Sequence, residues 1–134
     1  GKINQLGTLS EVMELCLVDE RLLPCIDFGH LNARTLGGIK TSEDYEKILD
    51  EIENKLGHDR LKHMHCHFSK IEYTAGGEKR HLTFDDETFG PDFTPLAELL
   101  YKKELCPTII CESSDVMDRD ALIMKKTYES FAEA

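Results

Sequence analysis

The sequence lacks several features that mark particular classes of protein. It has no long tract of serine, glycine or proline and no run of like charge, so little of the chain is expected to be disordered. It has no secretory signal and no apolar stretch long enough to cross a bilayer. These absences predict a soluble, cytoplasmic protein that does not enter a membrane.

Cysteine pairing motifs are also missing. The five cysteines are an odd number, and none of them forms a Cys-x-x-Cys pair. Cys25, Cys66 and Cys111 lie inside apolar runs, as expected of buried strands. Free thiols in a reducing compartment are therefore favoured over a disulfide framework.

Basic character is scarce, because 26 acidic residues outnumber 16 basic ones and give a net charge of -10. This balance argues against nucleic-acid binding over the whole surface, since phosphate contacts need a basic patch. A local basic rim around an acidic metal centre is still compatible with it. With 134 residues, of which 40% are hydrophobic, the chain is expected to form one core and one domain.

Strand and helix patterns alternate along the chain. Three compact apolar runs predict buried strands, and their apolar character on both faces is typical of parallel βα units. Helical spacing and capping boxes predict helices between them, and Gly76-Gly77 predicts a hairpin-like turn. The expected strands are 22–28, 61–68 and 107–112; the expected helices follow Thr8, Thr41, Pro91 and Asp115 or Asp118; 32–40 is expected to be a loop and 71–84 a hairpin.

The length admits only about three βα units, whereas a closed (β/α)8 barrel typically needs about 250 residues. Two interpretations follow: a small open α/β domain, or the C-terminal portion of a TIM barrel. Either one treats residues 1–134 as a single α/β domain with a hairpin-like loop.

Each expected strand ends beside a residue that can bind a metal ion. Because side chains alternate along a strand, His63, His65 and His67 share one face. One register then points Asp27, His65 and Glu112 inward together, near the strand ends where barrels assemble their sites. His65 is the favoured ligand of the three histidines. Two carboxylates and an imidazole suit zinc or manganese.

Two further histidines, His30 and His81, are placed to hold a second ion. The simplest structural alternative for Asp27 is a buried salt bridge, because an unpaired buried carboxylate is costly. Several cations fall in loops after the strands, where they would either contact phosphates or remain solvated: Arg34, Lys40, Lys70, Lys79 and Arg80.

Four segments together resemble the endonuclease IV family of apurinic/apyrimidinic endonucleases, within the xylose isomerase-like barrels. Residues 25–30 are similar to the family's Cys-Ile-Asp-x-x-His motif, and 64–70 to its Met-His-Leu-Asn-Asp-x-Lys segment. Arg80-His81 resembles the end of its Asp-Arg-His motif, and 110–113 its Leu-Glu-Thr segment. Order and spacing agree over nearly the whole chain.

This resemblance implies roles for individual residues. Asp27, His65 and Glu112 would bind one zinc ion and His30 and His81 another, within a site of two or three ions, with Glu112 as the catalytic residue. The implied reaction is hydrolysis of the phosphodiester 5′ to an abasic site, with the damaged nucleotide flipped out of the DNA. Arg34, Lys70 and Arg80 would contact the substrate.

The chain departs from the family in two ways. Lys79 replaces the aspartate that precedes the second-ion histidine by two residues, so that ion is weakened unless Glu78 or an acid of 85–87 substitutes. The family's remaining ligands, two histidines and a bridging glutamate, have no counterpart here. The chain is therefore interpreted as a C-terminal fragment that begins after the fifth barrel strand and is inactive alone.

Two other functions fit the same residues. Sugar isomerases and epimerases of this superfamily also use Asp, His and Glu on comparable strands, usually with one divalent ion, and Lys79 favours this interpretation. Alternatively, the chain is a non-catalytic, metal-binding half-barrel. Exposed strand edges and apolar inner faces would then cause it to self-associate.

Overall fold

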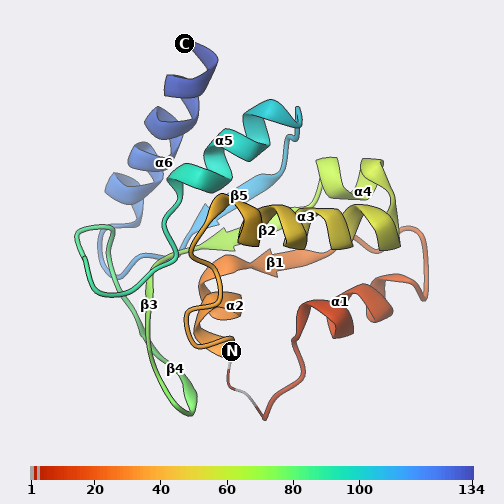
Figure 1. Cartoon of the computed structure of the whole chain (residues 1–134), viewed down its shortest axis with the longest axis horizontal. Helices are drawn as coiled ribbons and strands as arrows, with labels where there is room; N and C mark the ends of the chain where they lie inside the picture. The colour runs from red at the N-terminus through yellow and green to blue at the C-terminus, as the bar shows by residue number, and fades with distance from the viewer. Residues whose placement is uncertain (1, 3) are drawn as a thin grey trace.

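Three short strands form a parallel sheet at the centre of the computed structural model, which describes residue 2 and residues 4–134 (Figure 1). β2 (His65–Phe68) lies between β1 (Cys25–Asp27) and β5 (Thr108–Cys111). A strand–helix–strand order with parallel pairing is the arrangement of part of a TIM barrel. The predicted α/β class and its three parallel units are confirmed.

Helices precede, join and follow the strands, and some of them cover one face of the sheet (Figure 1). They are α1 (Leu9–Cys16), α2 (Phe28–Arg34), α3 (Ser42–Leu56), α4 (His58–Lys62), α5 (Thr94–Lys102) and α6 (Met117–Ala132). The capping boxes at Thr8 and Thr41 form as predicted, and Gly57 ends α3 with a φ of 90° that glycine adopts without strain. Within the described residues, no helix has the length and apolar character needed to cross a membrane.

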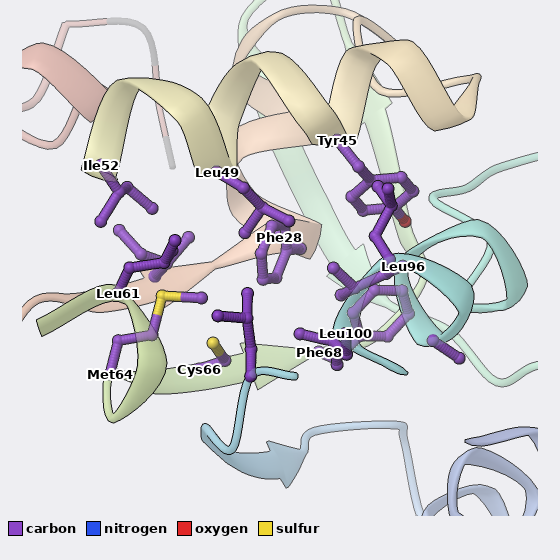
Figure 2. Packing of buried hydrophobic residues seen from close by; sticks show 14 of the residues in the cluster. Phe28, Tyr45, Leu49, Ile52, Leu61, Met64, Cys66, Phe68, Leu96 and Leu100 are labelled. Atoms are coloured by element: carbon purple, nitrogen blue, oxygen red, sulfur yellow. The ribbon is translucent and has the colours of Figure 1, made fainter. Parts of the chain in front are cut away.

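The core lies between this sheet face and the helices that cover it. Alternation along the strands places Ile26, Cys66 and Phe68 on the covered face, and all three are at most 2% exposed. Figure 2 shows Tyr45, Leu49 and other side chains of α3 and α5 packed over them. The tilted and edge-to-face contacts of Phe68 with Phe28 and Phe93 add to this packing.

The opposite face of the sheet is not covered by any helix in the described part of the chain. It carries Cys25 and Asp27 from β1, His65 and His67 from β2, and Ile110 from β5, which is 46% exposed. Period-two alternation thus separates a buried apolar face from a face that carries the cysteine, aspartate and histidine side chains of β1 and β2. In a barrel, this second face is the inner one.

A separate antiparallel hairpin follows β2 and consists of β3 (Ile71–Thr74) and β4 (Gly77–His81). Its register pairs Glu72 with Arg80 but Tyr73 with Glu78, so Lys79 is an extra residue on β4. Such an extra residue is a β-bulge, which changes the direction of the side chains that follow it. The predicted hairpin is confirmed, and α2 packs against both of its strands.

Several sequence-based boundaries are wrong. The first strand ends at Asp27, and α2 follows it directly, so residues 32–34 at the start of the expected 32–40 loop are helical. The final helix follows Val116, without a side-chain cap from either Asp115 or Asp118. Both differences reflect local geometry that overrides pattern: Asp27 itself caps α2, and Asp115 has a φ of 62° that lies outside a helix.

Gly29 is the point of closest approach between α2 and the chain that follows β2. A Cβ at this position would lie 2.5 Å from the backbone oxygen of Ser69 and 3.0 Å from the side chain of Ile71. We expect Gly29→Ala to lower the free energy of unfolding by about 1–3 kcal/mol, because the added methyl group overpacks this contact. Urea denaturation measures the change.

Gly76→Ala is the matched control, since its Cβ would meet only the Thr74 hydroxyl, at 3.8 Å. If both variants unfold at the same urea concentration as the original chain, α2 is not held tightly against this segment.

The uncovered sheet face and the outer strands predict self-association. Within the described sheet, β1 and β5 each pair on one side only, and exposed edges of this kind recruit further strands. We expect oligomers in light scattering, and Ile110→Lys should shift them toward monomer by placing charge on the exposed face. A monodisperse monomer at every concentration of the unmodified chain would contradict this expectation.

Candidate metal centre

Asp27 stands at the junction between β1 and α2, and each of its two carboxylate oxygens has contacts within the chain. Its Oδ1 accepts a hydrogen bond from the backbone N–H of His30 at 2.9 Å, which makes Asp27 the N-cap of α2. Its Oδ2 lies 3.7 Å from Nε2 of His30 and 3.6 Å from Nδ1 of His67. The cap therefore fixes the direction in which the second carboxylate oxygen points.

His67 and Glu112 complete a group around that oxygen. His67 is the register partner of Asp27 on the neighbouring strand, and its Nδ1 lies 3.3 Å from Oε1 of Glu112. The backbone N–H of Glu112 donates to the carbonyl of Phe68 at 2.9 Å and so continues the ladder just past β5. One donor atom from each of Asp27, His67 and Glu112 lies within 4.8 Å of the others.

A second group shares Glu112 with the first. His30, His81 and Glu112 each place one donor atom within 4.8 Å of the other two. The rings of His30 and His81 pack edge to face, and their centroids are 5.4 Å apart. The buried hydroxyl of Ser69 is hydrogen bonded to Nδ1 of His81 at 2.8 Å, which orients that ring and leaves Nε2 available.

The hairpin bulge brings an additional carboxylate to this second group. In a regular strand, residues 79 and 81 would share a face, and Lys79 would lie beside His81. The extra residue instead places Glu78 on that side, where its Oε2 contacts Nδ1 of His30. Lys79 pairs with Glu72 at 3.3 Å, outside the group. The acid that precedes Lys79 in the sequence thus lies beside His30.

The histidine that lies beside Asp27 and Glu112 is His67, which is not the one expected from the sequence. The sequence favoured His65, but His65 is the register partner of Cys25 and belongs to a different group, with Cys25 and His67. The physical reason is the register of the parallel pairing, which places His67 rather than His65 opposite Asp27. The ligand role of each histidine stays a prediction.

Negative charge dominates the surroundings of these residues. Burial, followed by the charges of Asp27 and Glu112, raises the pKa of the Cys25 thiol. The side chains of Asp27, His67 and Glu112 are 21%, 31% and 35% exposed, so a cation from solvent can reach them. Carboxylates and imidazoles at these positions fit zinc or manganese and leave coordination positions open.

Lys70, expected to contact substrate, has internal partners. Its ammonium donates to the carbonyls of Phe84, at 3.3 Å, and Asp86, and it lies 3.5 Å from the carboxylate of Asp92. The side chain is only 12% exposed. Lys70 therefore stabilises the segment between β4 and α5.

The other two expected substrate contacts are also engaged within the chain. Arg80 pairs with Glu72 across the hairpin, and Arg34 donates to the carbonyls of Lys2, at 2.9 Å, and Gln5. Substrate binding by Arg34, Lys70 and Arg80 stays a prediction. Sequence reasoning did not identify Ser69, since a serine near a strand end carries no distinctive signal.

Comparisons with known proteins agree with this geometry. The family model described as the xylose isomerase-like TIM barrel matches residues 1–131. An uncharacterized protein of Methanocaldococcus jannaschii is 39% identical over 96% of this chain and 45% of its own length. A probable endonuclease 4 of Staphylococcus carnosus is 30% identical over 63% of this chain and 31% of its own length.

The chain thus spans less than half the length of these two relatives. No solved structure matches it at a significant level. The family match, the parallel sheet and the ligand side chains near the carboxyl ends of its strands lead to one conclusion. This chain belongs to the xylose isomerase-like TIM barrel family.

Proposed function

We propose that this chain supplies part of the active site of a metal-dependent phosphodiester hydrolase of the endonuclease IV type, which cleaves DNA 5′ to abasic sites. The observation that carries the proposal is the position of Glu112 between two groups of donor atoms. A carboxylate shared by two groups can bind two neighbouring cations. Two neighbouring cations can stabilise both the attacking and the departing oxygen when a phosphodiester is hydrolysed.

The donor set supports zinc, or alternatively manganese. Asp27, His67 and Glu112 would hold one ion; His30, His81 and Glu112 would hold another, with Glu78 beside His30. Ions bound there would activate water at neutral pH and stabilise the charge of the departing oxygen. The two or three ions of a complete site would draw further ligands from outside these 134 residues.

The chain's own residues position these donors before any ion binds. The cap of α2 directs Asp27, the parallel register places His67 beside it, and the hydrogen bond between Nδ1 of His81 and the Ser69 hydroxyl holds the ring of His81. Prepositioning of this kind reduces the ordering that ligand binding would otherwise require. The named relative, a probable endonuclease 4, supports the reaction class.

A sugar isomerase or epimerase is the second candidate, and a specific observation favours it. The three cations expected to contact phosphates have internal partners, and the net charge is -10, so the described surface offers little to a DNA backbone. An isomerase would need only the ion held by Asp27, His67 and Glu112. We retain the nuclease as the first candidate, because an isomerase with one ion would leave the second group, His30, His81 and Glu112, without a role.

Manganese binding tests the first group of ligands. We expect His67→Asn to weaken Mn²⁺ binding at least about tenfold, because it removes a direct ligand, whereas loss of a supporting residue already costs about 10–100-fold. His65→Asn is the matched control and should leave Mn²⁺ affinity unchanged, since His65 lies outside the group. Isothermal titration of the metal-free chain measures both. If His65→Asn weakens Mn²⁺ binding and His67→Asn does not, His65 rather than His67 binds the ion.

Substitution of Glu112 tests whether this carboxylate serves both groups of donor atoms. We expect Mn²⁺, which prefers carboxylate to thiolate ligands, to raise the midpoint of thermal unfolding, with about 2.7 kcal/mol of added stability at a concentration of 100 times Kd. Glu112→Gln should remove most of this gain because it weakens both groups, while Glu98→Gln, which alters an exposed pair with Lys102, should retain it. Equal stabilisation of both variants would show that Glu112 binds no ion.

Activity is tested on the full-length natural protein that carries this chain, beside the 134 residues alone. We expect the longer protein, supplied with Zn²⁺, to nick a duplex that contains one abasic site, and to leave an identical undamaged duplex intact. The chain alone should be inactive because it lacks the other ligands that the resemblance implies. Epimerisation of ketoses without nicking would select the second candidate instead.

A further inference from the structure

The uncovered sheet face carries a second row of ligand side chains beside the carboxylate-containing groups. Cys25 and His65 are register partners, one row nearer the amino-terminal ends of the strands than Asp27 and His67. The Cys25 sulfur, a His65 nitrogen and a His67 nitrogen all lie within 4.8 Å of one another. Neither group around Glu112 uses Cys25 or His65.

The two rows differ in chemical character. Asp27 and Glu112 offer hard oxygen ligands, which manganese and similar ions accept. Cys25 offers a soft sulfur ligand, and with imidazoles it suits zinc, cobalt or cadmium. Along the strands, the row with the sulfur donor therefore lies beside the row with the oxygen donors. His67 has a nitrogen near Cys25 and His65 and also near Asp27 and Glu112.

The geometry requires only small side-chain movements. Metal–ligand distances of about 2.0–2.3 Å place tetrahedral donors about 3.5 Å apart, somewhat closer than the present limit of 4.8 Å. Cys25 is exposed, and His65 and His67 are half-buried on a face that no described helix covers. The centroids of their rings are 5.2 Å apart with the planes at 78°, and one nitrogen of each ring lies within 4.8 Å of the Cys25 sulfur.

We propose that Cys25, His65 and His67 form a distinct site for a thiolate-preferring divalent cation, and that this site competes with the Asp27–Glu112 carboxylates for His67. On binding, the ion takes the place of the thiol proton, which passes to the buffer. A cation in this site removes one ligand from the neighbouring site. The relative supply of soft and hard ions would thus decide which site is occupied.

Cobalt reports thiolate coordination directly, through sulfur-to-metal charge-transfer absorption in the near ultraviolet. We expect this band when Co²⁺ is added to the reduced, metal-free chain. Cys25→Ser should abolish it, and Cys106→Ser, which alters the other exposed cysteine, should retain it. His65→Asn should weaken the binding of Co²⁺ at least about tenfold.

The proposal and the proposed function can fail separately. Glu112→Gln should keep the cobalt band, because Glu112 is not in this group. The band per chain should not change with protein concentration, since all three ligands come from one chain. One equivalent of Cd²⁺ should reduce Mn²⁺ binding to the original chain but not to Cys25→Ser.

Three results would overturn the proposal. The first is a chain that is folded by circular dichroism but gives no charge-transfer band with Co²⁺. The second is a band that persists in Cys25→Ser or disappears in Cys106→Ser. The third is a band that grows with protein concentration, which would assign the ligands to two chains.

Discussion

The N-cap formed by Asp27 is the interaction on which the arrangement of ligands depends. A carboxylate that ends a strand and caps the next helix has one oxygen held by a backbone N–H, so its other oxygen has little freedom. Parallel pairing then places His67 opposite it, and Glu112 continues the ladder from the next strand. Three residues far apart in sequence converge because each has a backbone position fixed by secondary structure.

The hairpin makes the second contribution, and it depends on a local irregularity. Without the bulge, Lys79 would share a face with His81, and a cation would lie among groups that are suited to binding one. The extra residue moves Lys79 to Glu72 and brings Glu78 to His30. Lys79 therefore does not lie beside His81, as its place in the sequence suggests, and residue-by-residue comparison with a motif does not reveal this.

Much of the fold follows from the sequence, for identifiable reasons. The helix from Ser42 begins at a capping box and ends at a glycine with positive φ, and the apolar runs near Cys66 and Ile109 form the expected strands. The sequence could predict that side chains at the strand ends come together, because the carboxyl ends of parallel strands meet at one edge of a sheet. Their grouping could not be predicted, since it depends on the register of β2 against β1 and on the bulge, and both are set by pairing with other strands.

The cations that the sequence placed around the site illustrate a limit of the same kind. Lys70 follows a strand and looks available to a substrate in the sequence, but its ammonium has carbonyl partners in the segment before α5. Hydrogen bonds to a charged group typically contribute about 1.5–3 kcal/mol, so withdrawing Lys70 to a ligand would destabilise that segment. The acidic side chains among the donor groups are consequently Asp27, Glu112 and Glu78, whose negative charge would favour a cation there.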